Sequence, residues 1–600
     1  MNLKYKKEKF FFGINNSLLN NSWIKNNPNT RLSLNISQKY SLTNIISNML
    51  ALRTNKINDI KNFLNPTLDY YLPNPEIFND MKKAGDRIIN AIKNKEKIAI
   101  LGDYDVDGLS SIALLRKYFN SLNVNNYSYI PDRLTEGYGP NIKAIDIIKS
   151  KEASLLIMVD CGTNAHEVIS YVKKKNIDLI IIDHHKSYEK HIDVLALVNP
   201  NTLFDNSGYN FLCSAGLTFI LINYLQNLLK TKNVLIEKLP DIDKYLDMVA
   251  LATVCDVVPL IHLNRAFVFQ GLKTLSKRTN IGLKILSDES QLNKKPDEED
   301  LGFFFGPRIN AGGRIGKSNI GENLLICEDE NEAELLSKQL NTLNYQRKLI
   351  EEKVYEEAIN KIIKNNKIKK KSLFIYNPNW HEGVLGIVAS RIKEKFKKPV
   401  IILTKNKDIY KGSGRSILGV DIGLLILQAK QKKIIEGGGG HQMAAGLSIK
   451  ENKLNNFEIY FEDYVKNINN VGSDFRNLNI DEFLSINSVN DNLIEDINKI
   501  APYGLGNPKP KFLFHHVKII KPNVIGETKK HISFFITDAT SKTIKAIIFN
   551  AVDNDLGKAI LSNYKKNLFS FVGYLKKSIW KNKKYFEIII EDGVLGKVII

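Results

Sequence analysis

The segment Lys97-Ile-Ala-Ile-Leu-Gly-Asp-Tyr-Asp-Val-Asp-Gly108 decides the fold, because a short apolar run ends in three carboxylates, those of Asp103, Asp105 and Asp107. The run is continuous, contains β-branched residues and lacks the polar alternation of a half-exposed strand. Such runs are typical of strands buried on both faces of a parallel sheet. We therefore expect an α/β fold with a doubly wound parallel sheet, in which ligands bind beyond the carboxyl ends of the strands.

Two further apolar runs end in a similar way. Residues 155–159 lead into Asp160, and residues 178–182 lead into Asp183-His184-His185. Parallel strands would bring these groups to one edge, where like charges repel unless cations lie between them. Carboxylates and imidazoles without a thiolate suit manganese or magnesium better than a structural zinc. A fourth acid, Asp256, ends an expected apolar helix that begins at residue 246.

A calcium loop and a solvated turn are the alternatives for the Asp-rich segment, and an ordinary polar cluster is the alternative for the Asp-His-His triplet. The twelfth position from Asp103 is Leu114 and not the glutamate of an EF-hand, and a strand precedes the loop. Three strand ends of the same character make independent accidents improbable, so the metal centre is the preferred interpretation.

Composition points to a multidomain protein with a polyanionic partner. The 600 residues are 43% hydrophobic, and the formal net charge is +21. Abundant Lys, Asn and Ile throughout the chain offer a second explanation of this charge, a genome-wide nucleotide bias. The four cysteines lie far apart without a C-x-x-C pair, which fits a reducing cytoplasm. No apolar stretch approaches 18 residues and the N-terminal one is too short for a signal peptide, so we expect a cytoplasmic protein without membrane spans.

Hydrophobic periodicity divides the chain into five expected regions. They are a helical leader (1–75), the doubly wound domain (76–275), a helical connector (276–366), a smaller α/β domain (367–465) and a β-barrel of the OB type (466–600). Within the connector, residues 332–367 have long helical periodicity and heavy charge, as expected of a helix that bridges two lobes. Five strands are expected in the barrel, at 511–520, 531–537, 543–549, 568–575 and 585–591.

Three segments could contact an anion. Arg133 follows the expected strand 127–130, so it lies at the metal-bearing edge. The segment Gly412-Ser-Gly-Arg-Ser416 combines a flexible backbone with hydroxyls and a guanidinium, which suits a phosphate. The run Gly437-Gly-Gly-Gly-His441 lets another backbone or a phosphate approach closely, and we expect it to lead into a small-residue helix start.

One motif imitates a nucleotide-binding loop. Ala311-Gly-Gly-Arg-Ile-Gly-Lys-Ser318 satisfies the loose P-loop pattern, and residues 179–183 imitate a Walker B strand. A P-loop must follow a buried strand, and this one does not; the apparent B strand also lies upstream of it. An ATPase is therefore disfavoured.

Together these residues resemble the signature motifs of the DHH phosphoesterase superfamily, and most specifically its RecJ family of bacterial single-stranded-DNA-specific exonucleases. The glycine-rich stretch 437–446 resembles the motif of the family's DHHA1 domain. Three further segments are typical of RecJ and cover nearly the whole chain with the others: Gly306-Pro-Arg-Ile-Asn-Ala-Gly-Gly-Arg314, Trp380-His-Glu-Gly-Val-Leu-Gly386 and Pro502-Tyr-Gly-Leu-Gly-Asn-Pro508. One departure, Ser578-Ile-Trp580 for Asn-x-Trp, concerns a detail of the OB domain.

The resemblance implies roles for individual residues. The metal ligands would be Asp105, Asp107, Asp160, His184 and Asp256, with Asp103 and His185 beside them. The anchor of a 5′-phosphate would be Arg133, Ser413 and Arg415, while Arg308 and His441 match substrate-contacting positions. Base-stacking candidates in the barrel region are Tyr503, Phe514, Trp580 and Tyr585.

The implied activity is a 5′-to-3′ exonuclease that uses two Mn²⁺ ions, or Mg²⁺, to degrade single-stranded DNA to 5′-mononucleotides in repair and recombination. A helicase and a single-strand-binding protein are the implied partners, and a monomer is expected. Two alternatives remain open. One is a DHH phosphodiesterase acting on short or cyclic oligonucleotides, or a pyrophosphatase. The other is a non-catalytic DNA-binding scaffold, which the intact acid and histidine set disfavours.

Overall fold

The computed structural model describes residues 10–133, 135–137, 139–189, 191–232, 234, 239–468, 476–539, 542–580 and 583–596. Its first sheet is parallel and has the strand order β3-β2-β4-β5-β6. The strands are β2 (Ile98–Gly102), β3 (Asn126–Tyr129), β4 (Leu155–Val159), β5 (Asp178–Ile182) and β6 (Ala196–Val198). The order reverses at β2, as in a doubly wound fold, so the predicted fold class is confirmed.

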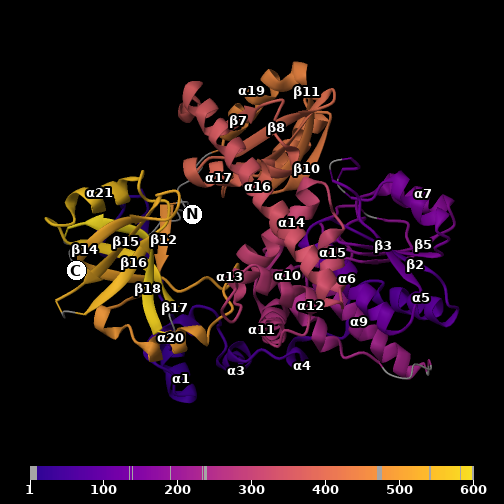
Figure 1. Cartoon of the computed structure of the whole chain (residues 1–600), viewed down its shortest axis with the longest axis horizontal. Coiled ribbons are helices and arrows are strands. Elements are labelled where there is room, and N and C mark those ends of the chain that lie inside the picture. Colours follow the sequence, from indigo (N-terminus) through magenta and orange to yellow (C-terminus); the bar gives the residue numbers. More distant parts are fainter. Residues whose placement is uncertain are drawn as a thin grey trace, which may run out of the picture.

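Both faces of this sheet are covered by helices (Figure 1). Ile98 and Ile100 of β2 pack into a core with α5, α6 and α9, whereas Ala99 and Leu101 pack into a second core with α7 and α8. The covering helices are α5 (Met81–Lys93), α6 (Val106–Ser121), α7 (Ile142–Ser150), α8 (His166–Lys174) and α9 (Ser214–Thr231). Burial on both sides explains why the strand sequences are apolar without alternation.

A helical region follows the sheet and ends in one long helix. Its members are α10 (Leu246–Cys255), α11 (His262–Ser276), α12 (Ile281–Glu289), α13 (Glu298–Asp300), the π-helical turn η5 (Leu301–Phe305), α14 (Gly306–Ile315), α15 (Ile320–Ile326) and α16 (Glu330–Lys364). The N-terminal part of α16 buries Leu340 in the core of the first sheet, and its C-terminal part buries Val354 in the core of the second lobe. The predicted bridging helix is therefore confirmed. The P-loop imitation begins on helix α14 and runs past its C-terminal end at Ile315.

The second lobe contains a mixed sheet with the order β10-β11-β9-β8-β7. Its elements are β7 (Leu373–Tyr376), α17 (Leu385–Phe396), β8 (Val400–Asn406), β9 (Ile409–Arg415), α18 (Ile422–Gln431), β10 (Gly437–His441), β11 (Ala444–Lys450) and α19 (Leu454–Lys466). Two expectations were wrong here. The glycine run is strand β10 and does not lead into a helix, and Gly412–Arg415 belong to strand β9 and not to a flexible loop.

Close backbone approach explains why glycines form β10. A Cβ added at Gly440 would lie 2.5 Å from the Cα of Ala445 on the paired strand β11. At Gly438 an added Cβ would lie 2.8 Å from the carbonyl oxygen of Gly446. Only glycine permits these distances, so Gly438 and Gly440 are required by the tight hairpin and are not a sign of a helix start.

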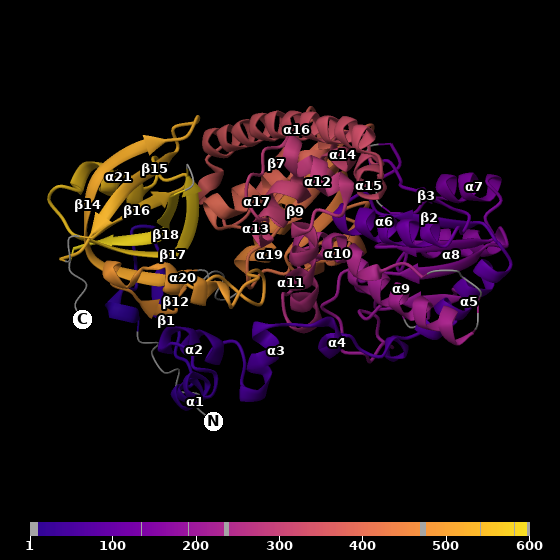
Figure 2. The same ribbon diagram turned by 60° about the horizontal axis from the view of Figure 1, so that its bottom comes forward.

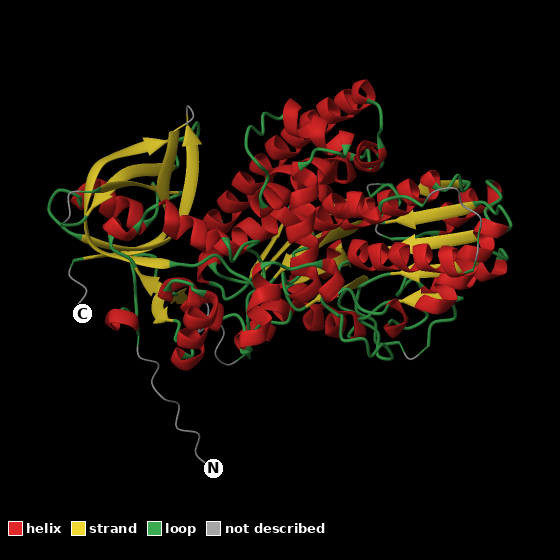
Figure 3. Ribbon diagram, turned by 90° about the horizontal axis from the view of Figure 1, so that it is seen from below, coloured by secondary structure: helices red, strands yellow, loops and turns green. Residues whose placement is uncertain are grey.

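The C-terminal domain is a β-barrel (Figure 3). Its strands are β14 (Phe512–Ile525), β15 (His531–Thr537), β16 (Thr543–Ile548), β17 (Phe569–Trp580) and β18 (Lys583–Leu595), with α21 (Asp555–Asn563) between β16 and β17. Pairing runs β14-β15-β16-β18-β17 and returns from β17 to β14, which closes the barrel. The predicted OB-type barrel is confirmed.

The leader packs against the barrel region rather than standing alone (Figure 2). Its helices are α1 (Thr30–Tyr40), α2 (Asn44–Ala51), α3 (Ile60–Leu64) and α4 (Leu68–Tyr71). Ile36 and Ile46 share a core with the barrel, and β1 (Ser22–Lys25) pairs in parallel with β12 (Asn477–Ile480), far away in sequence. Within the described chain, no helix is both long and apolar enough to cross a bilayer.

Candidate active site

The carboxylates and imidazoles predicted from the strand ends meet at one edge of the parallel sheet. Ligand-capable atoms form three overlapping groups, each with its members within 4.8 Å of one another. The groups are Asp103-Asp105-Asp160, Asp160-His184-His185 and Asp107-His184-Asp256. Asp160 and His184 each belong to two groups, so they lie at the centre of the cluster.

Helix N-termini hold the carboxylates of Asp105 and Asp107 in place. Asp105 caps α6, where its Oδ1 accepts hydrogen bonds from the backbone N–H of Asp107 and Gly108. Asp107 faces the start of α9, where its two oxygens accept from the N–H groups of Ser214 and Ala215 at 2.7 and 2.8 Å. Unsatisfied N–H groups and the positive end of the helix dipole favour a carboxylate at both places.

Asp160 and His184 are brought together by the ends of neighbouring strands. Asp160 adopts a left-handed backbone conformation with φ of 56° directly after β4, and its N–H donates to the Ser214 hydroxyl. His184 Nε2 lies 3.2 Å from Asp160 Oδ1 and 3.7 Å from Asp107 Oδ2, while its Nδ1 lies 3.7 Å from Asp256 Oδ2. One imidazole thus contacts three carboxylates from three different elements.

Asp183 orients the histidines and was not among the predicted site residues. Its Oδ1 accepts from the N–H groups of His184 and His185 and lies 2.8 Å from His185 Nδ1. Burial alone would raise the pKa of Asp183, but the His185 imidazole and these hydrogen bonds lower it below its usual range. Asp183 in turn overcomes the effect of burial on His185 and raises its pKa to about 9. The sequence signal that could have identified Asp183 was its position in the same Asp-His-His triplet as His184 and His185.

The electrostatics of the cluster fit divalent cations. Burial and neighbouring carboxylates raise the pKa values of Asp103, Asp160 and Asp256 above their usual range. In each, one buried oxygen accepts no hydrogen bond from the described residues. Burial lowers the pKa of the neighbouring His184 imidazole, which favours its neutral form. Buried carboxylate oxygens that repel one another, with this imidazole beside them, are the ligand atoms that Mn²⁺ or Mg²⁺ would use.

A cationic group faces this cluster from the second lobe. Arg415, on β9, donates to the Ser413 hydroxyl at 3.0 Å, and its pKa is lowered by burial and by the charge of Arg133. The Arg133 guanidinium lies 5.2 Å from the ring of Tyr104, the neighbour of Asp103, and its charge acts on both Asp103 and Arg415. A Cβ at Gly386 would lie 3.0 Å from Arg415 Nη2 and 3.2 Å from Ser413 Oγ, which shows that glycine opens the space in front of this pair.

Arg314 and His381 both lie close enough to Arg133 for its charge to act on them, and neither was predicted as a site residue. Burial and the charges of Arg133 and Arg347 lower the pKa of Arg314 to about 10. The pKa of His381 is likewise lowered by burial and by Arg133. Both residues lie inside motifs that carried the family resemblance, so the motifs contained them without indicating a role.

The remaining predicted residues have different surroundings. The His441 ring stacks near that of His185, with centroids 6.4 Å apart, so β10 brings it to the cluster. Arg308 instead bonds Ser290 and Asn341 and stacks on Phe304. Of the aromatic candidates, Phe514 is core, Tyr503 is buried, Tyr585 is 45% exposed, and the Trp580 side chain lies outside the described residues.

Three family models match the chain in the order of its domains. Residues 97–253 match the N-terminal domain of the DHH family, residues 369–467 match the DHHA1 domain, and residues 480–592 match the RecJ OB domain. The first match covers the acidic cluster apart from Asp256, and the second covers the lobe that carries Arg415. The fold and the site thus define a protein of the DHH class.

Comparison with related sequences identifies the family within this class. The single-stranded-DNA-specific exonuclease RecJ of Bacillus subtilis is 30% identical over 96% of this chain and 71% of its own length. The Escherichia coli protein of the same name is 33% identical over 74% of this chain and 79% of its own. The chain belongs to the RecJ family.

Solved structures share the fold of this chain. RecJ of Thermus thermophilus in complex with Mn²⁺ superposes with a TM-score of 0.78 at 23% identity, covering 95% of this chain and 78% of that one. Another exonuclease RecJ, bound to manganese, gives a TM-score of 0.56 at 28% identity over 65% of this chain and 96% of that one. RecJ structures with Mn²⁺ and with Mg²⁺ are both among the matches.

Proposed function

We propose that this chain is a metal-dependent exonuclease that degrades single-stranded DNA from its 5′ end and releases 5′-mononucleotides, in repair and recombination. One observation supports this most strongly: the buried acidic cluster faces Arg133 and Arg415, with Arg133 close enough to both for its charge to act on each. Carboxylates that can hold cations beside guanidinium groups that can grip a phosphate form a site for a terminal nucleotide.

The proposed ligands of two divalent cations are Asp103, Asp105, Asp107, Asp160, His184 and Asp256, with Asp160 shared between them. Asp183 holds His185 beside this set. When bound, Mn²⁺ or Mg²⁺ would supply a Lewis acid that stabilises charge on the scissile phosphate and the leaving 3′-oxygen. The helix N-termini at Asp105 and Asp107 orient two ligands before any cation arrives, so little reorganisation is required.

The proposed phosphate anchor consists of Arg133, Ser413 and Arg415, with Arg314 adding positive charge. A terminal 5′-phosphate is a dianion that a guanidinium can bind in a bidentate manner, which an internal phosphodiester does less well. An anchor of the terminal phosphate at a fixed separation from the acidic cluster would make the enzyme cut from the end. Arg308 and His441 are retained as weaker proposals for substrate contact, His441 because it approaches His185.

Digestion of single strands labelled at either end tests the proposal. With Mn²⁺ we expect mononucleotides from the 5′ label at the earliest times, shortening of the 3′-labelled strand, and no reaction in a chelator. Blunt duplex DNA and dinucleotides serve as comparison substrates. Faster turnover of dinucleotides than of long strands would favour the oligonucleotide phosphodiesterase alternative, and no hydrolysis in Mn²⁺ would favour a scaffold.

The cellular context is also a proposal. A single-strand-specific enzyme needs another protein to separate duplex DNA, so we propose a helicase and a single-strand-binding protein as partners. We further propose that the protein acts as a monomer in the cytoplasm. The four free cysteines, three of them buried, are compatible with a reducing compartment.

A further inference from the structure

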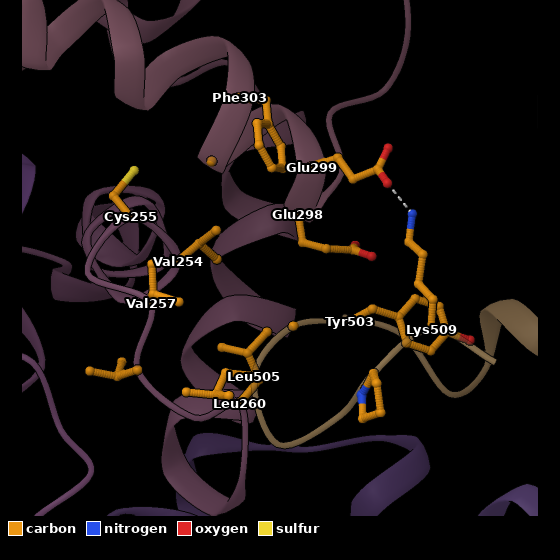
Figure 4. Close-up of a pocket in the computed structure, with 14 residues that line it drawn as sticks. Val254, Cys255, Val257, Leu260, Glu298, Glu299, Phe303, Tyr503, Leu505 and Lys509 are labelled. Carbon is orange, nitrogen blue, oxygen red and sulfur yellow. Dashed lines mark hydrogen bonds and ion pairs between the residues drawn. The ribbon is translucent and has the colours of Figure 1, made fainter. Parts of the chain in front are cut away.

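An apolar pocket of about 420 Å³ opens beside the acidic cluster, between α10, the turn η5 and the loop 503–509 (Figure 4). Val257, Phe303 and Leu505 line it, and their side chains are 65%, 84% and 56% exposed. Single exposed apolar residues are ordinary, but three gathered around one pocket mark a binding surface.

The pocket is preformed. The N–H of Leu260 donates to the carbonyl of Leu505 at 2.6 Å, and Asn507 Nδ2 donates to the carbonyl of Pro502 at 2.7 Å. A Cβ at Gly504 would lie 2.8 Å from Leu260 Cδ1, so the loop is packed tightly against the core. Leu505 is therefore presented to solvent by a rigid loop, which lowers the entropic cost of binding.

The pocket lies next to the proposed metal ligand Asp256. Val257 follows Asp256 directly and has a φ of 57°, a conformation in which a β-branched residue is strained. Such strain persists where the surrounding structure enforces it and is concentrated at functional sites. The strained residue turns an apolar side chain into the pocket next to a proposed metal ligand, so the occupant is expected to belong to the same substrate.

The charged side chains of the pocket favour the base of a nucleotide over its phosphate. Glu298 and Glu299 border it, and Lys509 pairs with Glu299 at its rim. Lys509 and Lys576 both pair with Glu299, so the carboxylate that would repel a phosphate is that of Glu298. A base, in contrast, offers apolar faces to the walls and N–H donors to Glu298. Carboxylates are the usual acceptors for the cytosine amino group.

We propose that this pocket takes one unstacked base of the DNA strand, downstream of the nucleotide held at the acidic cluster. The inference rests on the proposed function and names a contact that selects its substrate. A base inserted here cannot remain paired, and extraction of a base from a duplex is unfavourable. The pocket would thus discriminate against duplex DNA because it accepts only an unpaired base.

Binding of oligonucleotides with a single abasic site tests the proposal. A 5′-phosphorylated oligo-dC is measured against the full chain in chelator, with the abasic site moved along the strand. Wild type should lose affinity about five- to hundredfold at one position, the usual effect of one stacked base. Phe303→Ala should bind the intact strand with an affinity reduced by the same factor. An abasic site at the sensitive position should then cause no further loss of affinity.

Two controls separate folding from contact. Phe303 is 84% exposed, so its loss should leave the thermal midpoint unchanged, and Tyr70→Ala on α4 removes an exposed aromatic elsewhere and should retain full sensitivity. Glu298→Gln should keep stacking and reduce the preference for oligo-dC over oligo-dT.

The outcomes differ between this inference and the proposed function. If wild type hydrolyses single strands but no position is sensitive, or Phe303→Ala weakens intact and abasic strands equally, the base pocket is wrong and the surface suits a protein partner instead. If wild type neither binds nor hydrolyses single strands in Mn²⁺, the proposed function fails as well.

Discussion

The Arg265 guanidinium donates a 2.7 Å hydrogen bond to the carbonyl of Ala501 and thereby joins the helical core to the segment that leads into the barrel. It also bonds the carbonyls of Pro502 and of Phe63 in the leader, and it stacks on the Phe63 ring at 4.0 Å. Its side chain is 1% exposed, and burial lowers its pKa to about 10. One buried cation therefore connects three parts of the chain.

Arg265→Met should lower the free energy of unfolding by about 2–5 kcal/mol, because one buried and two partly buried carbonyls lose their donor. Urea unfolding of the full chain measures this change. Arg278→Met removes an arginine paired with Asp288 at the surface and should cost less than about 1 kcal/mol. Equal effects of the two substitutions would contradict the role given to Arg265.

Asp160→Ala should abolish hydrolysis and the thermal stabilisation that Mn²⁺ gives the wild type, since a ligand that binds only the folded state raises the midpoint. Without metal the variant should not be destabilised, because burial and its neighbours disfavour the Asp160 charge. Differential scanning fluorimetry with and without Mn²⁺ makes the comparison. Asp193→Ala, at an exposed ion pair, should retain the full Mn²⁺ shift; an unaltered shift in Asp160→Ala would argue against Asp160 as a ligand.

Arg415→Ala should slow the digestion of 5′-phosphorylated strands and erase their advantage over 5′-hydroxyl strands. One lost charge-assisted contact is worth roughly 1.5–3 kcal/mol, or about ten- to a hundredfold in rate. Rates for both ends in wild type and variant form a double cycle. A fall by the same factor on both substrates would mean that Arg415 does not bind the terminal phosphate.

Binding of single strands should weaken steeply with salt, because lysine and arginine displace condensed cations. For about five neutralised phosphates, the slope of log K against log salt should be roughly −3.5. Fluorescence anisotropy in chelator measures it without hydrolysis. A slope near zero would assign the net charge of +21 to nucleotide bias rather than to DNA binding.

Asp247, on α10, should make the stability of the chain depend on pH. Burial raises its pKa to about 7, and its Oδ2 accepts no hydrogen bond from the described residues. The unfolded carboxyl ionises near pH 4 and the folded one near pH 7, so stability is lost as pH rises through this window. A separation of about three pKa units corresponds to about 4 kcal/mol.

Asp247→Asn removes that ionisation and should be more stable than wild type at pH 8, with a smaller difference at pH 5. Unfolding of both proteins in chelator across this range gives the comparison, and the metal-ligand carboxylates cancel in the difference. A constant difference between pH 5 and 8 would show that Asp247 does not titrate there.

Local sequence determined the parallel sheet, the bridging helix and the barrel strands, because each has a periodicity that burial requires. It also determined the acidic cluster, since the carboxyl ends of neighbouring parallel strands must meet at one edge. Asp103, Asp160 and His184 could therefore be placed together before any coordinates.

Only the tertiary structure decided how distant segments approach. The glycines of β10 were expected to precede a helix, and only their pairing with β11 shows that they permit a tight hairpin. The approach of Arg133 to Arg415 and the pocket lined by Phe303 and Leu505 depend on elements hundreds of residues apart. The orienting contacts of Asp183 depend on the direction of its side chain. Sequence patterns record local burial, whereas these contacts arise from packing between elements, which no local pattern contains.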